Sequence, residues 1–577
     1  MAAVHALRMR LVSGRMRARA VAFGLGLLLL VVFLTQGIFF IRANAPTYDE
    51  ATHLASGYSY LATGDFRLEP QNPPLLKQLL ALPLFLIHRL PFHTDTQHWR
   101  DGMDFFVGQD FLYHSLLPAD QMLRLVRLSN LSIGALLIVL IGWWAFRLWG
   151  AKAAILAMLL ACVDPNLVAH SSLVTTDVGA TLFVVLTIYL LWEYFRDPVY
   201  WLLAAAGVSL GAALVSKFSA IVLIPIVGLI IALHLISVGG QSRALFPHRY
   251  PTRLGARFFD AAGAFLSFAF IAALVIPLAY GLQGFQQWFF GLERFLKLSQ
   301  DGQPAFFLGE YSYQGWWSYY LVAFLIKTPL GSLMLMALSL LLYQAGNRLK
   351  PCEAVFLLLP VIVILLATTQ AKVNIGLRHI LAVYPFLFVL ASRFATFRSQ
   401  RGWPAQLLIG IALIFTIVSS LRVAPHRLAY FNEIIGGPNQ GYRYLADSNL
   451  DWGQDLNGVK AYMDKEKLPI IYFSYFGSAP PSYYGIRYQY VPGTWPLEWP
   501  PPADKVPAAS QRKILAISAN NLQDVFTSYN PLFQWLRQRT PVIKVGYSIF
   551  LYDLSDDREG LARLEETYVK AGIPPAP

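Results

Sequence analysis

Cysteine and charged residues are scarce in this chain of 577 residues. The only two cysteines, Cys162 and Cys352, lie far apart in or beside apolar runs, which argues against a disulfide framework or a thiolate metal site. Charged residues make up 14% of the chain and hydrophobic residues 56%, a balance that excludes an ordinary soluble protein of this length. The composition therefore predicts a polytopic membrane protein.

Acidic residues are also few, 33 against 46 basic ones, which gives a net charge of +13. The basic residues lie largely in short segments between apolar runs, a pattern typical of cytoplasmic loops and not of a nucleic-acid-binding face. The chain lacks a soluble-type repeat and the glycine-rich phosphate motifs G-x-x-x-x-G-K-[ST] and G-x-G-x-x-G. Nothing in the sequence therefore indicates a cytoplasmic nucleotide site.

What the chain has in abundance is apolar runs of about 20 residues, the length that crosses the hydrocarbon core of a bilayer as a helix. Counting the apolar runs of roughly this length predicts about eleven membrane-spanning helices. They lie near 20–41, 124–147, 152–166, 172–195, 200–216, 218–237, 258–281, 316–343, 354–369, 379–396 and 404–422.

Basic clusters predict the orientation of these helices. Besides the segment before residue 20, they occupy 243–257, 347–350 and 398–401, and this helix count places all four on one side. By the positive-inside rule the N-terminus is cytoplasmic and the C-terminal region is outside the cytoplasm, as in an integral plasma (inner) membrane protein. The small residues Ala43 to Ala45 would suit a cleaved signal peptide, but the apolar run before them exceeds the usual signal core of about 7–15 residues, so an anchor helix is preferred.

Two segments outside the cytoplasm are large. We predict a transmembrane module over 1–422, with a large first outer loop over 42–123, followed by a small extracytoplasmic α/β domain over 423–577. In the outer loop, the apolar piece 75–87 is too short to span and is predicted to be an interfacial helix. In the C-terminal domain, strands are expected at 470–477, 513–519 and 542–554, helices at 454–467 and 523–539, and a proline-rich loop at 490–507.

Two adjacent acids, Asp49 and Glu50, come about eight residues after the first predicted helix, so a short linker holds them at the outer interface. A carboxylate near low-dielectric surroundings becomes a useful proton acceptor when a suitable partner is present. The structural alternative is a helix cap by Thr47 or Asp49, which taken alone explains the pair well. Asp177, at the outer mouth of the fourth predicted helix, also has a capping alternative.

Cationic side chains gather on the same side and favour the functional explanation. Ionisable residues inside or bordering membrane spans are costly, so function is the default explanation for Lys327, whereas Lys77, Lys372 and Arg378 could simply reach toward lipid headgroups. Carboxylates and cations together outside the membrane suit transfer of a group from a lipid-linked phosphate to a hydroxyl. The cations would stabilise the leaving phosphate, and an aspartate would take the proton of the acceptor.

At this point the sequence resembles a known superfamily, the C-type glycosyltransferases that use polyprenyl-phosphate sugars. This superfamily includes protein O-mannosyltransferases and the aminoarabinose transferase that modifies lipid A. The resemblance spans roughly the first 420 residues in topology. It rests on the order of four motifs: the Asp49–Glu50 pair, GDFRLEPQNPPLLKQLL (64–80), the TTD that ends at Asp177, and LRHILAVYPFL (377–387). Bacterial members are also similar to LAYFNEIIGGPNQGYRYLADSNLDWGQDL (428–456).

The resemblance implies roles for individual residues. It implies Asp49 as catalytic base, Glu50 as a neighbour that shapes the donor or acceptor site, and Asp177 as the second acid. The implied donor-phosphate ligands are Lys77 and Arg378, to which the basic residues on the same side, Lys327, Lys372 and His379, are added as candidates. It also implies the fold of the superfamily, a polyprenyl-phosphate donor, a lipid, glycan or protein acceptor, and inversion at the anomeric carbon.

The chain departs from the family pattern at Gln71 and Asn72. Relatives commonly carry His, or an acid followed by Lys, before the paired prolines, and in the aminoarabinose transferase that acid helps to hold a metal. No metal or other cofactor is therefore expected, although a divalent metal is compatible with the family. The outer-loop histidines show no compact zinc spacing and are interpreted as mobile loop residues; they are His53, His88, His93, His98 and His114.

Two further motifs receive structural explanations. DSNLDWGQD from Asp447 has Trp452 where an EF-hand needs Gly and Gly458 where it needs Glu, so calcium is rejected in favour of a helix start capped at Asp451. The aromatic segment 310–320 is interpreted first as an interfacial belt, with sugar stacking on Trp316 or Trp317 as the alternative.

The sequence thus predicts a membrane glycosyltransferase. The alternatives are a secondary transporter or lipid flippase, which would share helices and intramembrane charges, and a non-catalytic assembly subunit, which would leave Asp49 and Asp177 without purpose. Transporters usually show two matching halves, whereas this chain is lopsided, with a large loop at one end and a domain at the other. The discriminating observation is whether the two acids and Arg378 meet in one pocket.

Overall fold

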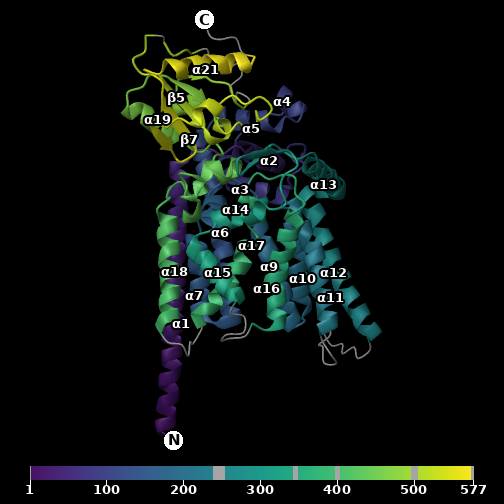
Figure 1. Ribbon diagram of the computed structural model, residues 1–577. Helices are drawn as coiled ribbons and strands as arrows, with labels where there is room; N and C mark the ends of the chain where they lie inside the picture. The colour runs from purple at the N-terminus through teal and green to yellow at the C-terminus, as the bar shows by residue number, and fades with distance from the viewer. Residues whose placement is uncertain are drawn as a thin grey trace.

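The computed structural model describes residues 2–237, 254–341, 349–396, 403–494, 504–507 and 509–572. It is a bundle of apolar helices with a mixed α/β region at one end (Figure 1). The fold class that the sequence predicts is therefore confirmed. The basic segment 398–401 lies wholly outside the described residues and 243–257 lies mostly outside them, as do half of 347–350 and part of the proline-rich loop 490–507.

The helices of the bundle follow the predicted apolar runs closely. They are α1 (Ala2–Ala43), α6 (Ala119–Trp149), α7 (Ala151–Val163), α9 (Asp177–Arg196), α10 (Tyr200–Leu214), α11 (Leu223–Ser237), α12 (Leu254–Tyr280), α14 (Tyr319–Lys327), α15 (Leu330–Leu341), α16 (Pro351–Thr368), α17 (Val383–Ser392) and α18 (Trp403–Leu421). Shorter elements between them are α8 (Pro165–Ser171), α13 (Gly284–Asp301) and the 3-10 helices η1 (Phe218–Val222) and η3 (Leu377–Ile380).

Among the described residues, five helices are individually long and apolar enough to cross a membrane, or up to seven if two bent pairs each count as one span. The other apolar helices are shorter, so the count of about eleven stays a prediction. One predicted span is wrong as a single helix: 316–343 is two helices, α14 and α15, that meet at 115°. The cause is Pro329, which disfavours the helical region for Thr328 and leaves that residue extended.

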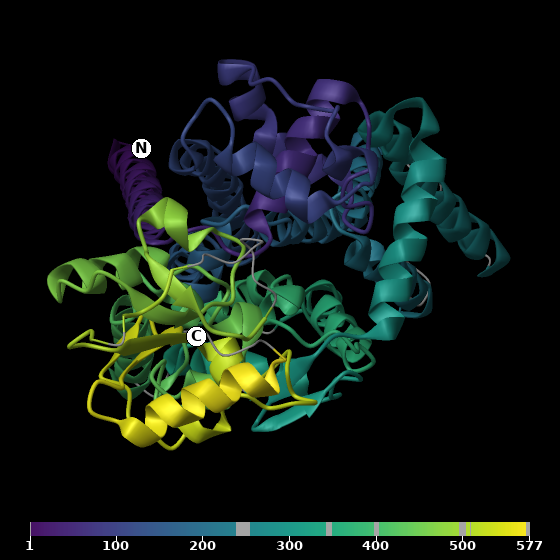
Figure 2. The same ribbon diagram turned by 90° about the horizontal axis from the view of Figure 1, so that it is seen from above.

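The first outer loop is helical and packs on one end of the bundle. Its helices are α2 (Glu50–Thr63), α3 (Pro74–His88), α4 (Gln97–Arg100) and α5 (Asp104–Tyr113). The short apolar segment predicted at 75–87 forms α3. Pro74 occupies the first position of α3, where the missing amide hydrogen costs nothing. Seen from above, these helices lie on the opposite side of this end from the C-terminal sheet (Figure 2).

The C-terminal region contains a five-stranded mixed sheet in the order β4-β3-β5-β7-β6. The strands are β3 (Ile471–Ser474), β4 (Tyr488–Tyr490), β5 (Ile514–Ser518), β6 (Ile543–Val545) and β7 (Ile549–Asp553). β3 pairs in parallel with β4 and β5, whereas β7 pairs antiparallel with β5 and β6. Its helices are α19 (Leu456–Lys465), α20 (Ala519–Leu522) and α21 (Arg558–Lys570), and a hairpin of β1 (Ala305–Phe307) and β2 (Glu310–Ser312) lies earlier in the chain.

Two expectations for this region are wrong. The strand predicted at 542–554 is a hairpin of β6 and β7, because Gly546 and Tyr547 both take positive φ and turn the chain. The helix predicted at 523–539 is mostly irregular. The carboxylate of Asp524 accepts hydrogen bonds from the backbone of Leu532 and Phe533, which ties this segment into a loop.

Candidate active site

A cavity of about 1530 Å³ lies where the outer loop, the membrane helices and the C-terminal region meet. Its apolar part includes Val184, Ile221 and Ile364 of the bundle, Phe295 and Leu298 of α13, and Trp452, Phe476 and Phe526 of the C-terminal region. Its charged and polar part includes Asp49, His53, Glu69, Gln71, Asp177, Lys217, Lys372, Arg378, His379 and Asp447. The structure therefore brings Asp49, Asp177 and Arg378 into one pocket.

Asp49 faces the cavity and does not cap a helix. It occupies the residue before α2, yet its side chain makes no capping hydrogen bond. Instead Arg378 Nη1 donates to Asp49 Oδ2 at 3.1 Å, across 329 positions of sequence. The capping interpretation of Asp49 is thus wrong, because Glu50 provides the local bonds: its Oε2 accepts from the backbone nitrogen and the hydroxyl of Thr47.

Asp177 begins α9 and holds two cations. Its Oδ1 pairs with the ammonium of Lys217, which lies just before η1, and its Oδ2 lies 3.9 Å from Arg378 Nη1. The Arg378 guanidinium stacks on the ring of Trp452 at 4.2 Å. Sequence reasoning missed Lys217, although a lone lysine between two apolar runs is itself a signal of function.

Lys77 does not line the cavity, in contrast to the role that the family resemblance implies. It is 1% exposed, and its Nζ lies 3.2 Å from Glu69 Oε2 and donates to Tyr60 Oη at 2.9 Å. His53 Nδ1 lies 2.9 Å from the same Glu69 oxygen, so His53 is a buried ion-pair partner and not the mobile loop residue expected. Burial raises the pKa of Glu69, but His53 and Lys77 outweigh that effect and hold the pKa at about 2.

This cluster includes Asn72, one of the two positions at which the chain departs from the family pattern. Asn72 Nδ2 donates to Glu69 Oε1 at 2.6 Å, so both oxygens of this carboxylate are occupied by protein donors. Lys77 supplies the positive charge that a metal would bring. Within the described ranges there is no group of three His, Cys, Asp or Glu side chains placed to hold a metal ion. The residues here therefore do not fit a metal site of that kind.

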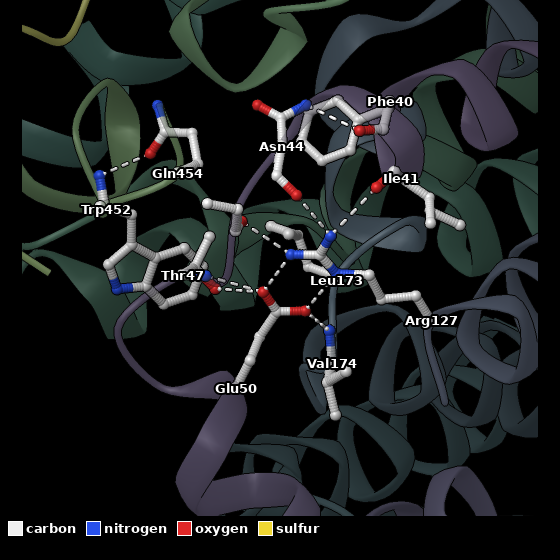
Figure 3. A network of polar contacts seen from close by, with 12 residues as sticks. Phe40, Ile41, Asn44, Thr47, Glu50, Arg127, Leu173, Val174, Trp452 and Gln454 are labelled. Carbon is white, nitrogen blue, oxygen red and sulfur yellow. Dashed lines mark hydrogen bonds and ion pairs between the residues drawn. The ribbon is translucent and has the colours of Figure 1, made fainter. Parts of the chain in front are cut away.

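Glu50 is buried behind the cavity and is not one of its described lining residues. Its carboxylate accepts from Arg127 at 2.8 and 2.6 Å and from the backbone of Val174 at 2.7 Å (Figure 3). Arg127 in turn donates to the backbone carbonyls of Asn44 and Ala45. Glu50 thus connects the end of α1, the outer loop, α6 and the segment before α9. It does not touch the cavity, and its role is to position Asp49 and Asp177.

The other predicted cations fall in different places. The Lys327 ammonium donates to the backbone carbonyls of Leu428, Tyr430 and Asn449, and Lys327 is 1% exposed and does not line the cavity. Lys372 lines the cavity and donates to the Gln300 carbonyl at 3.0 Å. His379 also lines it, and its buried Nε2 has no hydrogen-bond partner among the described residues.

The C-terminal region contributes an acid that sequence reasoning left without a role. Asp447 lines the cavity beside Arg378. It belongs to the 3-10 helix η8 (Asp447–Asn449), not to a calcium loop. Asp451 in the same motif does not cap α19, which begins at Leu456; its buried carboxylate accepts from the backbone of Asn520.

Comparison with known proteins gives one family match. Residues 110–286 match the sequence model of the family described as dolichyl-phosphate-mannose-protein mannosyltransferase. This segment contains Asp177 and Lys217. No curated protein matches the chain.

Solved structures of low sequence identity also match. ArnT from Cupriavidus metallidurans in the apo state is 13% identical, with a TM-score of 0.46 over 92% of this chain and 98% of that one. The Pmt1-Pmt2 protein O-mannosyltransferase complex of S. cerevisiae is 18% identical, with a TM-score of 0.32 over 46% and 34%. AglB from Archaeoglobus fulgidus, an oligosaccharyltransferase, is 12% identical, with a TM-score of 0.40 over 76% and 58%.

The family match does not support the transporter alternative. The predicted resemblance is confirmed over the matched segment, which covers part of the helical bundle and the second acid of the cavity. The chain is an integral membrane protein whose residues 110–286 are similar to the dolichyl-phosphate-mannose-protein mannosyltransferase family.

Proposed function

We propose that this enzyme transfers a sugar from a polyprenyl-phosphate donor to an acceptor hydroxyl on the extracytoplasmic side of the plasma (inner) membrane, with inversion. The observation that carries the proposal is that Asp49, Asp177, Lys217 and Arg378 meet in one cavity that also has an apolar part. The names of similar proteins agree with a lipid-linked donor, because they mention dolichyl phosphate and undecaprenyl phosphate.

The two kinds of wall match the two parts of such a donor. The apolar residues of α9, η1, α13 and α16 suit the prenyl chain, which gains about 25 cal/mol for each Å² removed from water. Arg378 and Lys217 suit the phosphate, because cations in a partly desolvated site stabilise the charge that develops on a leaving group. Asp177 holds both cations in place.

The proposed reaction is a single displacement. Asp49 takes the proton of the acceptor hydroxyl, the acceptor oxygen forms a bond to the anomeric carbon, and the bond from that carbon to the phosphate oxygen breaks. The electron pair of the broken bond stays on the lipid phosphate, which changes from a diester with one negative charge to a monoester. Attack opposite the leaving phosphate inverts the anomeric carbon.

The test is a transfer assay on purified protein. A panel of polyprenyl-phosphate sugars is incubated with lipid, glycan and peptide acceptors, and release of the lipid phosphate is followed. Release that requires both a donor and an acceptor would support the proposal. Transport of a lipid across vesicles without any release of lipid phosphate would instead support the flippase alternative.

A further inference from the structure

The segment Asp447–Ser448–Asn449 is built to place one carboxylate in the cavity. Ser448 Oγ donates to the carbonyl of Ile375 at 2.8 Å, and Asn449 Oδ1 accepts from the backbone of Leu377 at 3.0 Å. Both contacts fall on the loop that carries Arg378. Ser448 approaches this loop so closely that a Cβ at Gly376 would lie 2.1 Å from its hydroxyl oxygen. Two of the three residues therefore anchor the turn, and the third faces the cavity.

The backbone of Asp447 is strained in a way that the anchor maintains. Its φ is 55°, in the left-handed region that residues with a Cβ rarely adopt. The backbone nitrogen of Asp447 donates to Asn520 Oδ1 at 2.7 Å, which fixes this conformation from the side of the sheet. Strain of this kind gathers at functional sites.

One oxygen of this carboxylate stays available. Oδ1 accepts from the backbone of Ser448 at 2.6 Å, whereas Oδ2 has no hydrogen bond with any residue that the structure describes. Asp447 is half-buried and lines the cavity. The charged and titratable groups that act on it come from several elements: Arg378 of η3, Asp49 and Tyr48 before α2, Tyr319 and Tyr320 of α14, and Asp451 of its own segment.

The local charges do not favour a phosphate as they stand. Three carboxylates, Asp49, Asp177 and Asp447, surround the two cations Arg378 and Lys217. While the acceptor proton stays on Asp49, it offsets the charge gained by the lipid phosphate. The imbalance grows when Asp49 loses that proton, because the monoester product carries about −1.5 to −2 charges at pH 7 where the diester carried one. Once Asp49 is ionised again, another acid must be neutral for the product to stay bound.

We propose that Asp447 is a further active-site residue whose carboxyl group must be protonated for a lipid phosphate to bind beside Arg378, so that its ionisation drives release of the lipid phosphate product. This inference rests on the proposed function. Burial raises the pKa of Asp447 to about 7, with Arg378 opposing the rise and Asp49 adding to it, so the group changes charge near neutral pH. The other two acids are each held by a cation.

The experiment measures binding of undecaprenyl phosphate in detergent micelles to the purified full-length protein between pH 6.5 and 8.5. For the wild type, Kd should rise by up to about tenfold for each pH unit above 7, because the competent, protonated form becomes rarer. The Asp447→Asn variant should show a flat Kd apart from the titration of the phosphate itself, which both proteins share. Calorimetry in two buffers of different ionisation heat should show uptake of about one proton per lipid at pH 8 by the wild type only.

Asp104→Asn is the matched control. Asp104 lies in the same end of the molecule, and burial raises its pKa too, but it is not one of the described cavity-lining residues. Its pH profile should follow that of the wild type. Parallel profiles for wild type and Asp447→Asn would overturn the inference and leave the proposed function standing, whereas failure of the wild type to bind undecaprenyl phosphate at any pH would overturn both.

A folding check keeps the result interpretable. The pKa of Asp447 rises from 3.8 to about 7 on folding, so its ionisation lowers the stability of the fold as pH rises over this range. Asn cannot ionise, and Asp447→Asn should therefore raise Tm at pH 8. If this variant does not fold, calorimetry on the wild type still tests the inference, because binding of undecaprenyl phosphate without proton uptake at pH 8 contradicts it.

Discussion

At the scale of single residues, Asp49 is the side chain on which the proposed chemistry depends. A positioned general base contributes about 10²–10⁴-fold in rate, and Asn keeps the shape of Asp while it loses the basicity. Asp49→Asn should therefore fold and bind undecaprenyl phosphate, yet transfer sugar slower by about that factor. Turnover and Tm of the variant are the measurements. Near-normal turnover in a folded variant would contradict the catalytic role.

The chain offers a matched control for this test. Asp65 and Arg67 form an ion pair at 2.6 Å in the same outer loop, with side chains 33% and 41% exposed and outside the cavity lining. Asp65→Asn changes the same functional group in the same loop. It should leave both turnover and Tm close to those of the wild type, because exposed ion pairs contribute only about 0–1 kcal/mol.

Arg378 is predicted to bind the donor phosphate. A planar guanidinium can make two parallel bonds to a phosphate, and Lys replaces it poorly. Arg378→Lys should weaken binding of undecaprenyl phosphate by about 10–100-fold, the equivalent of one hydrogen bond to a charged group. Arg67→Lys is the control and should bind normally. Equal affinity of Arg378→Lys and the wild type would remove Arg378 from the phosphate site.

The pKa of Glu69 predicts how a fall in pH affects the stability of the fold. Its pKa falls from 4.5 to about 2 on folding, so its stabilising contribution is present above pH 4.5 and is lost as pH falls toward 2. Glu69→Gln should lower Tm at pH 7, because it leaves the buried Lys77 without its partner. The difference in Tm from the wild type should shrink between pH 7 and pH 3. A difference that stays constant over this range would mean that Glu69 is not ionised in the fold.

At the scale of elements, the apolar helices could be predicted from the sequence, because a length of about 20 apolar residues is sufficient evidence for one. The bend between α14 and α15 could have been read from Pro329, but the irregular course of 523–539 could not, since it depends on contacts of the Asp524 carboxylate with backbone groups eight and nine positions away. The site shows the same division. The family motifs predict Asp49, Asp177 and Arg378 as site residues. They do not predict Asp447, because it lies in the cavity only through the contacts of its turn with the Arg378 loop.

Lys327 holds one segment of the chain against another, a structural role that its sequence motif does not reveal. Its ammonium holds three carbonyls of the segment 428–449 against α14, so we expect it to position η8. Lys327→Met should lower Tm, because three buried carbonyl oxygens lose their donor, at about 1–3 kcal/mol for each group left unsatisfied. Lys372→Met, in which an exposed bond to Gln300 is lost, should keep its Tm. Weakened lipid phosphate binding by Lys327→Met with an unchanged Tm would instead return Lys327 to the phosphate site.

At the scale of the whole molecule, the sequence predicts which end faces the cytoplasm. The cavity lies where the outer loop, the membrane helices and the C-terminal region meet, and the proposed donor is used outside the cytoplasm. Reporter fusions after residue 577 should therefore give an extracytoplasmic signal, and fusions within 238–257 a cytoplasmic one. A cytoplasmic signal from the fusion at the C-terminus would contradict both the helix count and the proposed side of catalysis.

The anchoring of the segment 447–454 has a consequence for engineering new specificities. Its backbone also pairs with the outer loop: Tyr48 donates to the carbonyl of Trp452 and Ala45 to that of Gln454, at 2.9 and 2.8 Å. In a chimera joined at residue 422, where the last apolar run ends, the segment 447–454 would come from a relative. This foreign segment would then have to pack against the native loop that carries Arg378. A junction after Gln454 keeps the native segment with the Arg378 loop and the outer loop, and exchanges the sheet, which must then carry an equivalent of Asn520. Recombination among relatives should succeed at the later boundary and fail at the earlier one.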